Sequence, residues 1–363
     1  MLNTSPEAVE AILAGVEDIN LEKDLVSAEM VKDIQVNGDN IRISLQMGYP
    51  AQGYVDTLRD NIAERLRQVP GVKDVELDIN TDIRSHAVQR GVKPIDSVKN
   101  TIAVASGKGG VGKSTTAVNL ALALHAEGAK TGILDADIYG PSQPRMLGCR
   151  AKPDSHDGKS IEPNVSYHLQ SMSIGYLVNE ETPMIWRGPM VTSALEQMLG
   201  DTNWSDLDYL IIDLPPGTGD IQLTLCQKIP VSGAVIVTTP QDIALLDARK
   251  GLKMFEKVEV PVLGIIENMS THICGKCGYE EHIFGSGGGQ QMAEQYDVDL
   301  LGSLPLDLSI REGADNGRPT VAMAPDSPLA ATYRAISRRA AAKLSLRAKD
   351  YSASFPRIVV ENA

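Results

Sequence analysis

The segment from residue 107 to residue 115 carries the residue types that bind a phosphate chain. It follows an apolar run at 101–105, precedes a helical stretch at 116–127, and matches the pattern GxxxxGK[ST]. Glycines let backbone N–H groups surround the phosphates, and a helix N-terminus adds the positive end of its dipole. We expect Lys113 to reach the β- and γ-phosphates and Ser114 to hold Mg²⁺. The predicted nucleotide-binding residues here are Gly107, Lys108, Gly109, Gly110, Val111, Gly112, Lys113, Ser114 and Thr115.

Three carboxylates follow apolar runs that read as buried strands. Asp213 ends the run at 209–212, which is typical of the carboxylate that holds Mg²⁺ opposite a P-loop serine. Asp135 and Asp137 follow a second run, and we expect Asp135 near the metal and Asp137 to orient the attacking water. Any one of them could be a helix cap or a turn residue. Three such carboxylates at strand ends beside a P-loop favour a role in phosphate chemistry.

Cys274 and Cys277 form a CxxC pair, and two thiolates are half of what tetrahedral zinc or a [4Fe-4S] cluster needs. His272 and His282 could complete a zinc site within one chain. Alternatively, two subunits could each supply two thiolates to a cluster on the dimer axis. A redox-active dithiol is a weaker interpretation, because no strand–CxxC–helix pattern surrounds the pair. Spacing alone leaves these alternatives open.

The composition excludes several classes of protein. The chain has 363 residues, of which 42% are hydrophobic and 22% charged, so it folds and has room for two domains. A net charge of −13 argues against a nucleic-acid-binding surface. No apolar stretch is long enough to span a membrane, and residues 1–10 lack the features of a signal peptide. We therefore expect a cytoplasmic protein whose few cysteines are reduced.

Periodicity divides the chain into two domains. Residues 1–82 predict a small α+β domain in the order α-β-β-α-β, and residues 83–99 read as a linker. Residues 100–347 predict an α/β domain with a doubly wound, mainly parallel sheet, followed by a tail at 348–363. Its expected strands are 101–105, 131–135, 209–213, 234–238, 262–267 and 300–304.

The phosphate-binding loop, with its second lysine at position 108, resembles that of the MinD/ParA/nitrogenase-iron-protein class of deviant P-loop ATPases. Within that class, further stretches resemble the Mrp-type (ApbC-like) iron–sulfur cluster carriers. These are residues 135–142, 186–190, 213–220 and 267–270, together with the CxxC pair. The N-terminal domain resembles one found in iron–sulfur assembly proteins. That domain often has Cys-Pro where this chain has Tyr49-Pro50.

The resemblance implies a slow, dimer-dependent ATPase with Lys108, Lys113 and Asp137 as its catalytic residues. In that class the extra lysine crosses a homodimer interface to the partner's nucleotide, and the residue matching Asn268 hydrogen-bonds adenine. The implied ligands are ATP, Mg²⁺ held by Ser114, Asp135 and Asp213, and a [4Fe-4S] cluster shared between two subunits through Cys274 and Cys277. The implied partners are cluster donors or scaffolds and apo iron–sulfur proteins that accept the cluster.

The alternative function is a MinD/ParA-like positioning ATPase with a structural zinc site. Such ATPases attach to membranes through a terminal amphipathic helix, and residues 328–342 form a helical stretch with three arginines. That stretch is rich in alanine and has no Trp or Phe to anchor it. We therefore expect no stable membrane association and no nucleic-acid partner.

Overall fold

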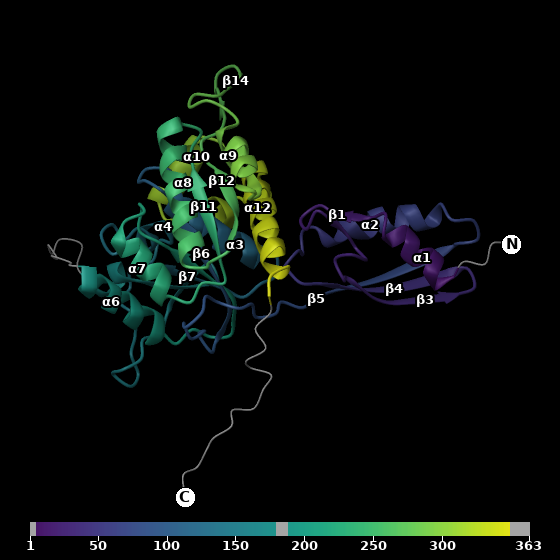
Figure 1. The fold of residues 1–363 in the computed structure, drawn as a ribbon, viewed down its shortest axis with the longest axis horizontal. Coiled ribbons are helices and arrows are strands. Elements are labelled where there is room, and N and C mark those ends of the chain that lie inside the picture. Colours follow the sequence, from purple (N-terminus) through teal and green to yellow (C-terminus); the bar gives the residue numbers. More distant parts are fainter. Residues whose placement is uncertain (1–4, 179–187, 349–363) are drawn as a thin grey trace, which may run out of the picture.

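The computed structural model describes residues 5–178 and 188–348. The N-terminal domain lies to one side of a larger α/β domain (Figure 1). Its elements follow the predicted order: α1 (Pro6–Leu13), β3 (Val31–Asn37), β4 (Asn40–Met47), α2 (Val55–Arg67) and β5 (Asp74–Thr81). A short pair, β1 (Glu17–Asp18) and β2 (Lys23–Asp24), was not predicted. Strand β4 pairs antiparallel with β3 and parallel with β5, because α2 carries the chain across between them.

An eight-stranded sheet forms the centre of the α/β domain, in the order β15-β12-β11-β6-β10-β7-β9-β8. All six expected strands are in it, which confirms the predicted fold class. They are β6 (Val98–Ala105), β7 (Thr131–Asp135), β10 (Leu207–Asp213), β11 (Gly233–Thr238), β12 (Val262–Glu267) and β15 (Leu300–Ser303). The edge strand β8 (Asn164–Ser166) and its neighbour β9 (Leu169–Ser173) were missed because most of their residues are polar. Only β8 in this sheet runs antiparallel to its neighbour.

Helices cover both faces of the sheet, as the apolar strands require. On one face pack α3 (Lys113–Ala126), α11 (Thr320–Met323) and α12 (Pro328–Ser345). On the other pack α6 (Gly188–Gly200), α7 (Asp220–Lys228), α8 (Asp242–Lys257) and α9 (Gly288–Tyr296). The short helices α4 (Gln143–Met146), α5 (Ile174–Leu177) and α10 (Leu308–Asp315) lie in connections that follow strand ends.

Helix α12 includes the stretch that we considered as a membrane anchor. Its buried residues, among them Tyr333, Ile336 and Leu344, lie in the same core cluster as the apolar side chains of α3. The apolar face of α12 is therefore used inside the protein. No helix among residues 5–178 and 188–348 is long and apolar enough to cross a bilayer.

The segment between the domains differs from the predicted linker in two respects. Strand β6 begins at Val98, so the last two residues of the predicted linker belong to the sheet. Gln89 is buried, and its Nε2 donates to the carbonyls of Cys226 (2.7 Å) and Ile229 (2.6 Å). Its Oε1 accepts a hydrogen bond from the Val231 amide (2.8 Å). Contacts between residues this far apart in the chain leave no periodic pattern, so the segment read as a polar linker.

Glu127 joins the two domains at the end of α3. Its fully buried carboxylate accepts hydrogen bonds from Arg334 Nε (2.6 Å) and Arg338 Nη1 (2.7 Å) on α12. Its other oxygen accepts from the Gly53 amide of the N-terminal domain (2.8 Å). In Figure 1, α12 lies along the side of the larger domain that faces the N-terminal domain. One carboxylate thus ties α3, α12 and the N-terminal domain together.

We predict that Glu127→Gln lowers the free energy of unfolding by about 3 kcal/mol, because it leaves two partly buried guanidinium groups without their counter-ion. Urea denaturation of the full chain measures this. The control is Glu256→Gln, which breaks an exposed pair with Lys253 and should cost less than about 1 kcal/mol. If Glu127→Gln lowered the free energy of unfolding as little as Glu256→Gln does, Glu127 would not anchor the domains.

Candidate functional site

The phosphate-binding loop connects β6 to α3, and its glycines are required by geometry. Gly112 has φ of +81°, and a Cβ there would lie 2.2 Å from Asn268 Nδ2. A Cβ on Gly107 would lie 2.2 Å from the backbone carbonyl carbon of Asp247. The loop lines a cavity of about 250 Å³ that also includes Asp137 and Pro216. The chain therefore folds an open, glycine-lined hollow at the N-terminus of a 14-residue helix.

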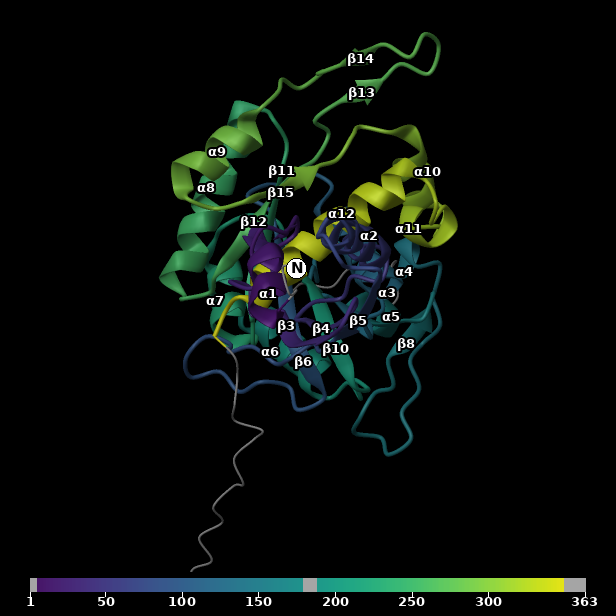
Figure 2. The same cartoon turned by 90° about the vertical axis from the view of Figure 1, so that its right-hand side faces the viewer.

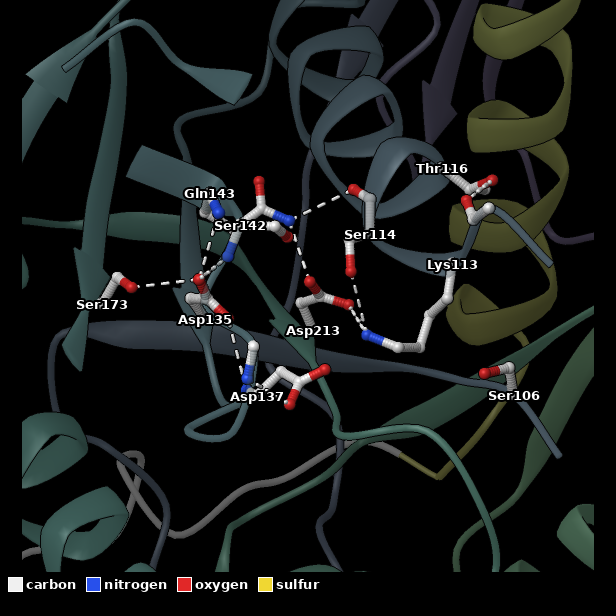
Figure 3. Close-up of polar contacts among 12 residues, drawn as sticks. Ser106, Lys113, Ser114, Thr116, Asp135, Asp137, Ser142, Gln143, Ser173 and Asp213 are labelled. Carbon is white, nitrogen blue, oxygen red and sulfur yellow. Dashed lines mark hydrogen bonds and ion pairs between the residues drawn. The ribbon is translucent and has the colours of Figure 1, made fainter. Parts of the chain in front are cut away.

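Lys113 and Asp213 form a buried ion pair beneath this loop (Figure 3). The Lys113 ammonium also donates to Ser114 Oγ at 3.1 Å. It therefore contacts two of the three oxygen groups that the sequence predicts as Mg²⁺ ligands. A cation already lies between these oxygens, so the donor set fits a hard divalent metal.

Asp135 is the third predicted metal ligand, and it is fully buried. Its Oδ2 accepts hydrogen bonds from the Ser142 amide, the Gln143 amide and Ser173 Oγ, each at 3.0 Å. Burial, and then the charge of Asp213, raise the pKa of Asp135 to about 7. Lys113 pairs with Asp213 and acts on Asp135 only through its charge, so a divalent cation would find two buried carboxylates with one ammonium between them and the phosphates.

Asp137 lies at the edge of the same cavity and is partly exposed. Burial raises its pKa, and the nearby Lys113 acts in the opposite direction. Its backbone amide donates to Asp135 Oδ1 at 3.2 Å. Hence the chain brings Asp137 close to the P-loop, as expected for a group that orients water at the terminal phosphate.

Lys108 also lines the cavity and is partly exposed. Its backbone carbonyl accepts from Ser106 Oγ at 3.0 Å, which holds the loop while leaving the ammonium unconstrained. Among the described residues its side chain forms no ion pair, unlike that of Lys113. Lys108 therefore lies at the site, but among the described residues its ammonium pairs with no carboxylate.

Asn268 lies beside the loop, but its polar atoms are engaged within the protein. Its Nδ2 donates to the Val111 carbonyl at 2.8 Å, and its Oδ1 accepts from the Met269 amide at 2.9 Å. An adenine contact would compete with these bonds. In this structure, Asn268 helps to shape the P-loop.

Cys274 and Cys277 lie at the end of a hairpin that projects from the larger domain (Figures 1 and 2). The hairpin consists of β13 (His272–Ile273) and β14 (Glu280–Glu281). Cys277 is exposed and Cys274 is partly exposed. Backbone N–H groups, first that of Lys276 and then that of Cys277, lower the pKa of Cys274. The hairpin thus presents two accessible sulfurs, one of them favoured as the thiolate.

The two histidines of the zinc alternative point to backbone carbonyls. His272 Nδ1 lies 3.1 Å from the Leu306 carbonyl, and His282 Nδ1 lies 2.8 Å from that of Ser270. Within residues 5–178 and 188–348, no group of three or more His, Cys, Asp or Glu side chains is arranged to hold a metal.

The structure adds Ser142, Gln143 and Ser173 to the predicted site. All three donate hydrogen bonds to Asp135. The side chain of Gln143 also donates to Asp213 and to the Ser114 backbone carbonyl. Ser142 is the last residue of the stretch at 135–142 and Gln143 follows it directly, but neither was predicted as a site residue. Within the motif at 186–190, Trp186 and Arg187 lie outside the described residues.

A P-loop on β6 and a carboxylate at the end of the adjacent strand β10, within a mainly parallel sheet, define a P-loop ATPase. Residues 97–341 match the family described as NUBPL iron-transfer P-loop NTPase, and the chain belongs to that family. Residues 6–79 match the iron–sulfur cluster assembly protein family.

Proteins from three organisms are similar to this chain over about two thirds of its length or more. An Escherichia coli (strain K12) iron–sulfur cluster carrier protein is 51% identical over 94% of both chains. The mouse iron–sulfur cluster transfer protein NUBPL is 51% identical over 72% of this chain and 83% of its own. A solved nucleotide-binding protein from Archaeoglobus fulgidus, in complex with ADP, is 36% identical with a TM-score of 0.55. The match covers 65% of this chain and 91% of that one.

We predict that Cys274 is alkylated by iodoacetamide at neutral pH faster than an ordinary exposed cysteine. Its lowered pKa keeps more of it as the reactive thiolate, and the rate should fall as pH drops through that pKa. Peptide mass spectrometry of anaerobically prepared, metal-free protein measures the rate. Cys226, whose pKa burial raises to about 12, is the internal control and should not react. A rate for Cys274 that already falls as the pH drops through the usual thiol pKa would contradict the prediction.

Proposed function

We propose that this protein is a cytoplasmic ATPase that works as a homodimer, carries a [4Fe-4S] cluster between its two subunits, and transfers it to apo iron–sulfur proteins. The observation that carries the proposal is the position of the thiols. Cys274 and Cys277 follow β12 and the P-loop follows β6, so both leave the carboxyl edge of one parallel sheet. The names of the relatives support the nature of the cargo. Cysteines can bind a cluster only while they are reduced, which fits the reducing environment of the cytoplasm.

In the nucleotide site, we assign the triphosphate to the glycine-lined hollow, with adenine near Asn268. Lys113 exchanges Asp213 for the β- and γ-phosphates, and Asp137 orients the attacking water. The ligands of Mg²⁺ are Ser114, Asp135 and Asp213. When bound, Mg²⁺ neutralises charge on the phosphates.

Lys108 is assigned to the partner's nucleotide. Lys108 lines the cavity, and no carboxylate among residues 5–178 and 188–348 pairs with its ammonium. A cation supplied in trans stabilises the charge of the transition state, so that hydrolysis is slow in the monomer. The same dimer gives the cluster its four thiolates, two from each subunit.

The absorption spectrum of the anaerobically reconstituted protein tests the cargo. A broad visible band, with iron and sulfide each at about four per dimer, is expected for a shared cluster. A colourless protein with stoichiometric zinc would overturn the proposal and favour the positioning ATPase.

For the ATPase, we predict that Lys113→Ala abolishes hydrolysis and weakens nucleotide binding. Lys108→Ala should reduce kcat at least tenfold while leaving nucleotide binding nearly intact, since its charge acts in the partner's transition state. Phosphate release and nucleotide titration measure the two effects.

A mixture of subunits tests whether Lys108 acts in trans. In a dimer of one Lys108→Ala and one Asp137→Ala subunit, one of the two sites keeps both groups and should recover activity. Each variant alone is the control. No recovery at any mixing ratio would place the action of Lys108 within its own chain.

For the cargo, we predict that Cys274→Ala or Cys277→Ala loses the cluster and the activation of an apo iron–sulfur enzyme, but retains ATP binding. Closure of a dimer around nucleotide moves the subunits, so the transfer rate should change among no nucleotide, ADP and ATP. Lys113→Ala, loaded with cluster, is the control and should not respond. Equal rates of the unmodified protein in all conditions would mean that the two sites are uncoupled.

A further inference from the structure

Gln143 is a fully buried amide that contacts every element of the predicted metal site (Figure 3). Its Nε2 donates to Asp213 Oδ2 at 2.9 Å and to the Ser114 backbone carbonyl at 3.1 Å. Its backbone amide donates to Asp135 Oδ2 at 3.0 Å. One residue on α4 thus joins β7, β10 and the first turn of α3.

The orientation of this amide follows from its neighbours. A carboxylate and a carbonyl can only accept hydrogen bonds, so Nε2, and not Oε1, must face them. As a result Oε1 is buried, with no hydrogen-bond partner among the described residues. A buried, unpaired oxygen destabilises the fold, and an apolar side chain of similar volume would avoid that cost. The retained amide therefore indicates a requirement for its two N–H groups.

Asp213 needs a donor that stays in place when nucleotide binds. Its other partner, Lys113, is the group that a P-loop uses for the phosphates, so that contact is exchanged during the cycle. Gln143 is fixed through its own backbone and through Ser114, which opens the P-loop helix. It can hold the Asp213 carboxylate in one orientation whether or not Lys113 has left.

We propose that Gln143 is a positioning residue for Mg²⁺, which orients Asp213 and fixes its distance from Ser114 without touching the metal itself. This inference rests on the proposed MgATP site. Groups that hydrogen-bond to metal ligands set their geometry, and their loss weakens metal binding by about 10- to 100-fold. The effect should appear in the metal-dependent part of nucleotide binding and not in the part that the P-loop supplies.

The test compares Gln143→Met with unmodified protein. ATP affinity in the presence of EDTA should change less than about twofold, whereas the Mn²⁺ concentration for half occupancy, followed by electron paramagnetic resonance with ATP bound, should rise about tenfold. Excess Mg²⁺ should restore part of the lost hydrolysis rate. Gln143→Glu, which places a second acceptor against Asp213, should be at least as impaired as Gln143→Met.

Gln89→Met is the matched control, because Gln89 is another buried glutamine, in the segment between the domains, that donates to backbone carbonyls of the ATPase domain. It should leave the Mn²⁺ affinity unchanged, whatever it does to the melting temperature. Unchanged Mn²⁺ affinity in Gln143→Met, or an equal loss of metal-free and metal-bound ATP affinity, would overturn the inference. If the unmodified protein itself shows no metal dependence of ATP binding, it is the proposed MgATP site that fails.

Discussion

The balance of charge around Asp135 and Asp213 constrains the rest of the nucleotide site. Two carboxylates buried side by side cannot both remain ionised unless cations or hydrogen-bond donors offset them. The chain itself meets this requirement with Lys113 and with donors from the segment that follows β7. Lys113 can leave only when another positive charge replaces it, so metal and nucleotide are expected to bind together.

The direction of the parallel strands determines where everything else can lie. Because β6, β7, β10, β11 and β12 share one direction, their carboxyl ends meet at one edge. The P-loop, the carboxylates and the cysteine hairpin all leave the sheet there. Helix α3 runs back from that edge for about 21 Å. Its far end, at Glu127, is where the N-terminal domain binds. Chemistry and domain attachment are thus at opposite ends of the same helix.

The sequence is informative where one local pattern determines the structure, and silent where distant residues do. Most of the six predicted strands are runs of buried apolar residues, and the P-loop is a fixed spacing of glycine, lysine and serine, so both could be predicted. Strands β8 and β9 are polar and short, and only their pairing defines them. Gln143 and Gln89 have their roles through partners 70 and 137 residues away. No spacing rule marks such residues, because a glutamine on its own is most often at the surface.

The neutralisation of Glu127 is completed within the ATPase domain. Both of its arginine partners, Arg334 and Arg338, belong to the ATPase domain, and the N-terminal domain adds one backbone N–H from Gly53. Separation of the domains would therefore leave no unpaired charge at this point. The same holds for Lys343, which pairs with Glu22 of the N-terminal domain at 2.9 Å and keeps Asp299 of its own domain as a second partner at 3.0 Å. At both points the ATPase domain carries its own counter-ions, so its charge balance does not depend on the attached domain.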